Sequence, residues 1–228
     1  SDQILEGDPI DYKSLVIIGG GVIGVEFATF YQNLGCNVTI VEAMDRLLPT
    51  MDREISQNLG MILKKRGASI HTGAMVQKVT NEDGVLSCHF VQNDQDHVVQ
   101  AQGILVAIGR RPNTQELFGP VISPKMDRGR IMTEPDFSTS IENVWAIGDV
   151  ASSIQLAHLA SAQGIAVAEI IAGHKLSPDL STVPACIYTD PEIASVGLSA
   201  DEAKAQGISV QTGKFLMAAN GKTIIEGK

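Results

Sequence analysis

Cysteine, aromatic residues and positive charge are all scarce in this chain. Its 228 residues include three cysteines, an aromatic content of 4%, and 17 basic against 26 acidic residues, which gives a net charge of −9. Cys36, Cys88 and Cys186 are too few and too widely spaced for a disulfide framework or a zinc site. We interpret them as small buried hydrophobic residues in a reducing compartment. The acidic balance argues against a nucleic-acid partner, which requires basic stripes.

Long hydrophobic runs are also missing. No apolar stretch approaches the roughly 18 residues that a membrane span needs, and no secretory leader precedes the first predicted strand. We therefore expect a soluble, cytoplasmic protein with no membrane partner. The length allows one large or two ordinary domains. Because the sequence does not begin with Met and its first element starts soon after the terminus, we expect a piece of a longer protein.

The clearest motif begins at residues 15–18, an apolar, β-branched run that predicts a strand buried on both faces of a parallel sheet. The run leads into the spacing Gly19-x-Gly21-x-x-Gly24, which is typical of a tight turn where backbone approaches a pyrophosphate and a helix packs closely on a strand. Apolar residues at helical spacing follow from 21 to 34. The unpaired N–H groups at the start of that helix favour phosphate.

A second strand at 37–41 ends at Glu42, about where an acid accepts hydrogen bonds from an adenine ribose. A carboxylate there would repel a 2′-phosphate, so NAD is favoured over NADP. A glycine-rich turn can occur without a ligand, and Glu42 alone is compatible with a solvated strand end. The order of strand, turn, helix, strand and acid favours the dinucleotide site.

The fold class that follows is α/β, with a Rossmann-like domain built on a parallel sheet. We expect a second helix at 51–66 and a third parallel strand from 69–70. A small antiparallel meander follows at 76–79, 85–90 and 98–100, and a buried strand at 104–108 ends at Gly109.

Further along the chain, a short strand at 144–147 leads into Gly148 and Asp149. This places a carboxylate at the carboxyl end of a strand, where open α/β sheets bind ligands, although Asp149 is also suited to capping the helix that we expect at 154–172. Residues 210–216 and 223–225 are predicted to form strands.

Several separate motifs carry a family resemblance. The runs IGGGVIGVE, LVAIGRRPN and TSIENVWAIGDV, in this order, resemble the flavoprotein disulfide reductases of the class I pyridine nucleotide-disulfide oxidoreductase family. Within that family, QLAHLASAQG at 155–164 and CIYTDPEIASVGLS at 186–199 are most similar to the dihydrolipoamide dehydrogenase branch. The resemblance runs from about Lys13 to the end of the chain.

The resemblance implies three parts: an NAD-binding domain at 12–110, the C-terminal segment of an FAD-binding domain at 111–178, and the truncated start of an α+β interface domain at 179–228. It implies NAD and FAD as cofactors and no metal. The implied NAD residues are Gly19, Gly20, Gly21, Val22, Ile23, Gly24, Val25, Glu26, Glu42, Val76 and Gly109. The implied FAD residues are Asp149, Gln155, Leu156, Ala157 and His158.

Two positions carry particular expectations. Relatives in the family pair the acid at Glu26 with a lysine that this chain lacks, so we expect Glu26 to look exposed or to have a raised pKa. At Gln163 the family often has Glu, and the change keeps size and hydrogen bonding but loses the charge.

Members of the family need a redox-active Cys-x4-Cys pair, and no two cysteines here have that spacing. They also need a His and Glu pair from the interface domain, and we expect the chain to end before it. We therefore expect no catalytic residue here and an inactive fragment. The intact homodimer would pass electrons from the dihydrolipoamide of a 2-oxoacid dehydrogenase or glycine-cleavage complex through FAD to NAD. Alternatives are a mercuric or glutathione reductase, a transhydrogenase, or a stand-alone nucleotide-binding module.

Overall fold

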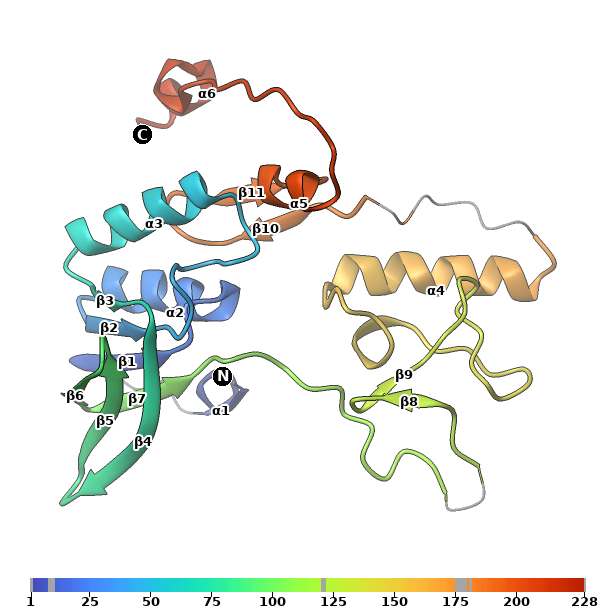
Figure 1. The fold of residues 1–228 in the computed structure, drawn as a ribbon, viewed down its shortest axis with the longest axis horizontal. Coiled ribbons are helices and arrows are strands. Elements are labelled where there is room, and N and C mark those ends of the chain that lie inside the picture. Colours follow the sequence, from blue (N-terminus) through green and yellow to red (C-terminus); the bar gives the residue numbers. More distant parts are fainter. Residues whose placement is uncertain (1, 8–10, 120–121, 175–179, 181, 228) are drawn as a thin grey trace.

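A four-stranded parallel sheet organises residues 14–106. The structure is a computed structural model that describes residues 2–7, 11–119, 122–174, 180 and 182–227. The strands lie in the order β3-β2-β1-β7, and all of their pairings are parallel (Figure 1). Their carboxyl ends therefore meet at one edge of the sheet. The bounds are β1 (Ser14–Ile18), β2 (Asn37–Val41), β3 (Ser69–His71) and β7 (Gly103–Val106).

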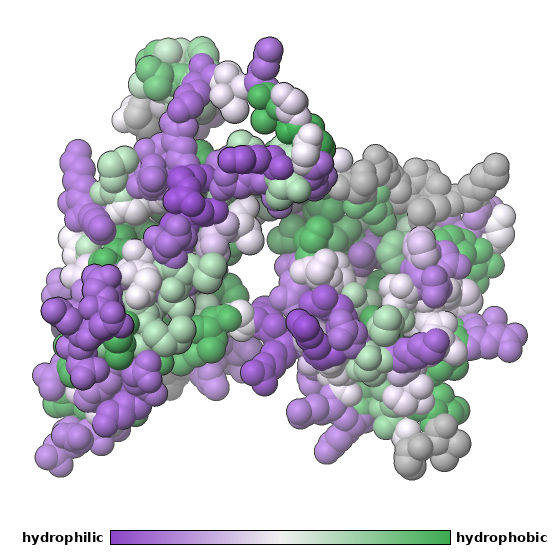
Figure 2. Space-filling view, in the orientation of Figure 1, coloured by the Kyte–Doolittle hydropathy of each residue, from purple (hydrophilic) through white to green (hydrophobic). Residues whose placement is uncertain are grey.

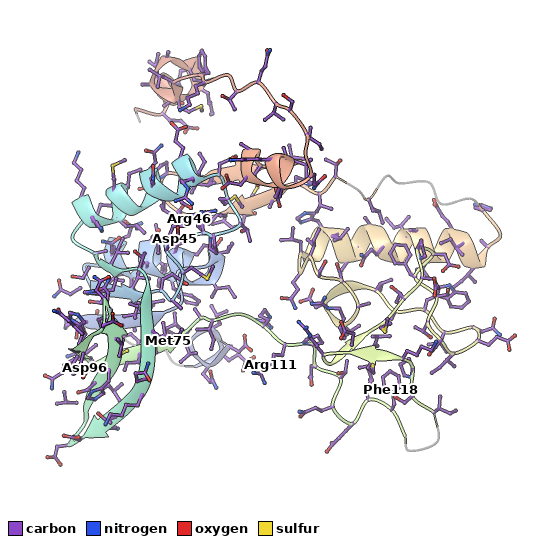
Figure 3. All side chains as sticks on the ribbon, in the orientation of Figure 1. Asp45, Arg46, Met75, Asp96, Arg111 and Phe118 are labelled. Atoms are coloured by element: carbon purple, nitrogen blue, oxygen red, sulfur yellow. The ribbon has the colours of Figure 1, made fainter. Side chains whose placement is uncertain are left out.

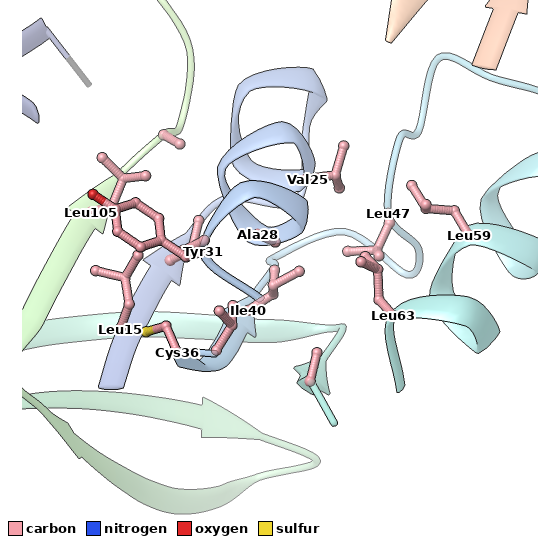
Figure 4. Close-up of a cluster of buried hydrophobic side chains, with 14 of the residues drawn as sticks. Leu15, Val25, Ala28, Tyr31, Cys36, Ile40, Leu47, Leu59, Leu63 and Leu105 are labelled. Atoms are coloured by element: carbon pink, nitrogen blue, oxygen red, sulfur yellow. The ribbon is translucent and has the colours of Figure 1, made fainter. Parts of the chain in front are cut away.

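Two helices cover one face of this sheet. Helix α2 (Val22–Asn33) follows β1 and helix α3 (Arg53–Lys65) follows β2, as the sequence predicts. Gly35 and Gly67 follow these helices with φ of 81° and 101°, so both occupy the left-handed position expected of helix C-caps. The two helices and the sheet enclose one hydrophobic core (Figure 4). Its members include Leu15, Ile17, Val25, Ala28, Tyr31, Ile40, Leu59, Leu63 and Leu105.

An antiparallel meander covers the opposite face. It comprises β4 (Ala74–Glu82), β5 (Val85–Gln92) and β6 (Gln95–Ala101), each longer than predicted. Successive strand residues point to opposite faces, and Val16 and Val41 accordingly pack against Cys88 and Phe90 while their sequence neighbours face the helices. The prediction of an α/β fold with a parallel sheet and a meander is confirmed.

Residues 122–174 form a second part, seen on the right of Figure 1. It contains the strand pair β8 (Met126–Asp127) and β9 (Arg130–Ile131), the short helix η1 (Gly148–Val150), and α4 (Ala157–Ile171), followed by Gly173 with φ of 81°.

The predicted strand at 144–147 is wrong, because only an isolated bridge between Ser138 and Trp145 forms there. The segment 144–147 exchanges two backbone hydrogen bonds with residues 137–139, in which Thr139 and Ala146 donate their N–H groups. No strand of the described part pairs with the other edge of this segment. The predicted domain boundary between 178 and 179 touches residues outside the described part of the chain.

The last part contains the strand pair β10 (Ala185–Ile187) and β11 (Ile193–Ser195), then α5 (Ala200–Ala205), η2 (Met217–Ala219) and α6 (Gly221–Ile225). Ile187 and Ile193 pack onto the core beneath α2 and α3. The strands predicted at 210–216 and 223–225 are wrong: the first range has no regular structure up to residue 216, and the second lies in α6. A strand needs a hydrogen-bonded neighbour, and none of the described residues pairs with 210–216.

One cysteine differs from its interpretation. Cys36 and Cys88 are buried, but Cys186 is exposed because it is the outward-facing residue of the short strand β10.

No helix within the described residues is long and apolar enough to cross a membrane. At the other end of the chain, α1 (Asp2–Glu6) packs its Ile4 against the core.

Candidate functional site

A cleft of about 910 Å³ opens at the carboxyl edge of the parallel sheet. Figure 2 shows an opening between the part that holds the sheet and the part that holds α4. The cleft is lined by the turn after β1, the residues after β2 and β7, the start of β4, and the residues before α4. The lining residues are Ile18, Gly19, Gly21, Val22, Ile23, Val41, Glu42, Ala43, Pro49, Thr50, Ala74, Met75, Val76, Val106, Ala107, Ile108, Gly109, Arg110, Gln155 and Leu156.

The three glycines of the motif after β1 have different surroundings. At Gly19, φ is +108° and a Cβ would lie 2.4 Å from the carbonyl oxygen of Ala107. At Gly24, a Cβ would lie 1.9 Å from the carbonyl oxygen of Gly19, so only glycine lets α2 pack this closely on the turn. At Gly21, a Cβ would meet nothing within 4 Å, and the residue lines the cleft. Gly21 therefore presents bare backbone to the cleft at the start of α2.

Glu42 is the acid of the site. Its side chain is buried, and its carboxylate accepts hydrogen bonds from the backbone N–H groups of Gly20 and Met44, the latter at 2.6 Å. These two bonds fix the carboxylate directly behind the glycine turn. An anion held by backbone donors at the end of β2 is suited to accept hydrogen bonds from a sugar hydroxyl.

Two other chain segments complete the cleft. Val76 lies on β4, beside a register shift in its pairing with β5, and both Val76 and the neighbouring Met75, labelled in Figure 3, line the cleft. Gly109 follows β7 with φ of +119°, and the next residue, Arg110, also lines the cleft. Val76 and Gly109 are predicted site residues, whereas Arg110, in the same motif as Gly109, is not among those predicted.

Four residues of the predicted NAD set do not line the cleft. Gly20 is buried in the turn, Gly24 is buried at the start of α2, and Val25 is fully buried in the core. Glu26 is half-buried, and its carboxylate accepts a 2.8 Å hydrogen bond from the N–H of Tyr188. The expectation of an unpaired, exposed Glu26 is therefore wrong. The partner is a backbone N–H directly after the end of β10, and no side-chain pattern indicates a donor of this kind.

The predicted FAD residues divide between two places. Gln155 and Leu156 line the cleft just before α4, while Asp149 is exposed in η1. The ring of His158 is exposed and its Nε2 lies 2.8 Å from the carbonyl oxygen of Pro184.

Gln163 supports this region from inside α4. Its side chain is buried, and its amide oxygen accepts a 2.7 Å hydrogen bond from the N–H of Gly148. Gly148 has φ of +67° and directly precedes Asp149. The uncharged amide therefore holds the turn that presents Asp149, so an acceptor and not a charge is what this position requires.

The charges of the cleft suit an elongated ligand with phosphates. Among the described residues that line it, Glu42 is the only anion and Arg110 the only cation, and most of the remainder are apolar or glycine. A bare glycine turn, the start of a helix and a fixed carboxylate are the groups that hold a dinucleotide. No cluster of three or more His, Cys, Asp or Glu side chains that could hold a metal ion occurs in the described ranges.

Comparisons with known proteins identify the family of this chain. The family model described as pyridine nucleotide-disulphide oxidoreductase matches residues 1–164, and its dimerisation domain matches residues 183–228. A dihydrolipoyl dehydrogenase of Bacillus subtilis is 40% identical over 100% of this chain and 48% of its own length. One from Mycoplasma pneumoniae is 40% identical over 97% of this chain and 47% of its own length.

Solved structures show the same relationship. The flavoprotein disulfide reductase RclA of Escherichia coli superposes with a TM-score of 0.87 at 27% identity, over 98% of this chain and 50% of that one. LpdA of Mycobacterium tuberculosis superposes with a TM-score of 0.87 at 27% identity, over 99% and 49%. The chain thus spans about half the length of the relatives it matches. It belongs to the pyridine nucleotide-disulphide oxidoreductase family.

Proposed function

We propose that the cleft binds NAD in an extended form along the carboxyl edge of the sheet. The observation that carries this proposal is the pairing of a bare Gly21 at the start of α2 with a buried Glu42 held behind the same turn. In this assignment the N–H groups at the start of α2 bind the pyrophosphate. Glu42 accepts the hydroxyls of the adenine ribose, and Val76 contacts the adenine.

The residues of the site act by binding and orientation. Bound NAD would supply a hydride acceptor. Gly19 and Gly109, both at positive φ, let the backbone at the ends of β1 and β7 pass close to the ligand. Glu42 excludes a second anion at the ribose, because its buried carboxylate and a 2′-phosphate would repel each other. Val22, Ile23 and Val106 give the cleft apolar walls that would pack against the ligand.

The FAD assignment concerns Asp149 and residues 155–158. Asp149 presents an exposed carboxylate on a turn that Gln163 fixes, and the start of α4 offers backbone N–H groups beside it. These are groups that fit the hydroxyls of a flavin side chain. We assign residues 12–110 to an NAD-binding domain, 111–178 to part of an FAD-binding domain and 179–228 to the start of an interface domain.

For the whole protein we propose dihydrolipoyl dehydrogenase activity, with electrons passing from dihydrolipoamide through a redox disulfide and FAD to NAD. The identity of 40% to relatives of that name supports this branch of the family. The lipoamide substrate would belong to a 2-oxoacid dehydrogenase or glycine-cleavage complex. This chain by itself should be inactive, because it has no Cys-x4-Cys pair.

We further propose a homodimer. The match of residues 183–228 to a dimerisation domain supports it. So does the exposure of large apolar side chains near the end of the chain, including Phe215 at 67%, Leu216 at 78% and Ile225 at 81%. Apolar groups at this density mark surfaces that another protein surface covers.

Titration of the purified chain with NADH, monitored by calorimetry, tests the proposed NAD site. We expect saturable binding of one NADH per chain and loss of that binding in Glu42→Ala. The matched control is Glu54→Ala, which removes an acid from the exposed side of α3, away from the cleft. Absence of NADH binding, or equal losses in the two variants, would contradict the assignment.

A further inference from the structure

We propose that Arg110 is the cation that contacts the pyrophosphate of the bound dinucleotide, and that Asp2 competes with the phosphates for its guanidinium. The inference rests on the proposed NAD site and deepens it. The N-terminal helix α1 then sets the affinity of the cleft for its ligand.

The order of the strands places Arg110 where this contact is possible. Glu42 follows β2, Gly19 to Gly21 follow β1, and Arg110 follows β7 after a short connection. Because β1 lies between β2 and β7, these groups follow one another along the same edge of the sheet. Neighbouring strands are about 4.8 Å apart. A ligand whose ribose meets Glu42 and whose phosphates meet Gly21 therefore continues toward the end of β7.

The cleft has an unbalanced charge for such a ligand. A pyrophosphate is doubly negative, and the glycine turn contributes backbone N–H groups but no formal positive charge. Of the described residues that line the cleft, Arg110 alone is basic. A guanidinium is also the side chain best shaped to donate two hydrogen bonds to phosphate oxygens.

In this structure the guanidinium of Arg110 is paired with Asp2. The distance from its Nη1 to the Asp2 Oδ1 is 3.1 Å, and the side chains are 50% and 62% exposed. Asp2 is carried on α1, which is held in place by the packing of Ile4 on the core. The carboxylate that pairs with Arg110 therefore comes from outside the cleft, because no residue of α1 lines the cleft.

An exposed ion pair of this kind is weak, and it is easily exchanged for a stronger partner. Surface pairs contribute little net free energy, whereas a hydrogen bond from a guanidinium to a phosphate is charge-assisted and about twice as strong as a neutral one. Arg110 can therefore leave Asp2 when a pyrophosphate enters. Each ligand that binds has to displace the Asp2 carboxylate, which lowers the apparent affinity.

The test is NADH binding by calorimetry to the full chain and four variants: Arg110→Ala, Arg111→Ala, Asp2→Asn, and the double variant Arg110→Ala with Asp2→Asn. Arg111 is the matched control, because it is the adjacent arginine, is exposed and does not line the cleft. Figure 3 places it on the chain that crosses toward the part containing α4. Thermal unfolding of each variant shows whether the fold is retained.

We expect Arg110→Ala to weaken NADH binding about tenfold or more and Arg111→Ala to leave it unchanged. Asp2→Asn should strengthen binding by about two- to fivefold at low salt, and this gain should fade as the ionic strength rises. In the absence of Arg110 the Asp2 substitution should have no effect. If Arg110→Ala is destabilised, Arg110→Lys keeps the charge and should retain part of the affinity.

Three results would overturn the inference. Equal NADH affinity in the parent chain and Arg110→Ala would show that Arg110 does not contact the ligand, while the NAD assignment would stand. A gain from Asp2→Asn that persists without Arg110 would show that Asp2 acts independently. Failure of the parent chain to bind NADH would overturn the NAD assignment, and the inference would fall with it.

Discussion

Substitution of two glycines in the motif after β1, Gly21 and Gly24, should separate stability from binding. Gly24→Ala places a Cβ 1.9 Å from the carbonyl oxygen of Gly19, which is backbone and cannot move aside like a flexible side chain. Overpacking of this kind costs about 1–3 kcal/mol, and replacing a helical glycine recovers about 0.5–1 kcal/mol. With the obstacle at 1.9 Å we take the upper end, so Gly24→Ala should lower the free energy of unfolding by about 2 kcal/mol.

Gly21→Ala should behave in the opposite way. A Cβ at Gly21 meets nothing within 4 Å, and the φ of −72° is accessible to alanine. The loss of a favourable N-cap residue and the reduced entropy of the unfolded chain nearly cancel, leaving a change within about 0.5 kcal/mol. The added methyl group enters the cleft where the phosphates approach, so NADH affinity should fall about tenfold or more.

Urea unfolding and NADH calorimetry on both variants check the two predictions. Gly24→Ala should unfold at lower urea, and Gly21→Ala should unfold like the parent chain but bind poorly. A stable Gly24→Ala would contradict the steric reason given for that glycine. A Gly21→Ala variant that binds NADH as tightly as the parent would show that the ligand does not approach this turn.

Three further predictions follow from single contacts. Gln163→Leu leaves the N–H of Gly148 without its buried acceptor and should cost about 1–3 kcal/mol in urea unfolding, while Gln163→Glu, which keeps an acceptor, should cost less. Cys186 should react quickly with an alkylating reagent, and the two buried thiols, whose pKa is raised by burial, should react only after unfolding, as mass spectrometry would show. Hydrogen bonds from the backbone N–H and hydroxyl of Ser199 lower the pKa of Glu202. Because the pKa is lowered in the folded state, the stabilisation of α5 is present at neutral pH and is lost as the pH falls through that lowered pKa. Ser199→Ala should reduce this acid dependence, as measured by hydrogen exchange of the α5 backbone.

The sequence predicted best the elements that local chemistry determines. Strand β1, the glycine turn, α2 and β2 lie where residues 15–42 place them, because β-branched runs, helical periodicity and Gly35 as a C-cap are all local signals. The meander was located but underestimated in length, because strand ends depend on pairing with neighbours.

Contacts between segments that are distant in the sequence are harder to predict from the sequence. Residues 210–216 and 144–147 have strand-like composition, but the described chain gives them no full set of hydrogen-bonding neighbours. The partner of Glu26 is the backbone N–H of Tyr188, 162 residues away in sequence, and backbone donors leave no trace in residue type. Arg110 lines the cleft beside Gly109, but the sequence alone does not show which side chains after a strand face a cleft.

The preference of the chain for NADH over NADPH tests the central claim most directly. Glu42 is buried and fixed by the N–H groups of Gly20 and Met44, so it cannot swing away from a 2′-phosphate. Calorimetry with the two dinucleotides at the same ionic strength should show binding of NADH and an affinity for NADPH lower by about tenfold or more. Equal or tighter binding of NADPH would contradict the role of Glu42 and, with it, the proposed orientation of the dinucleotide in the cleft.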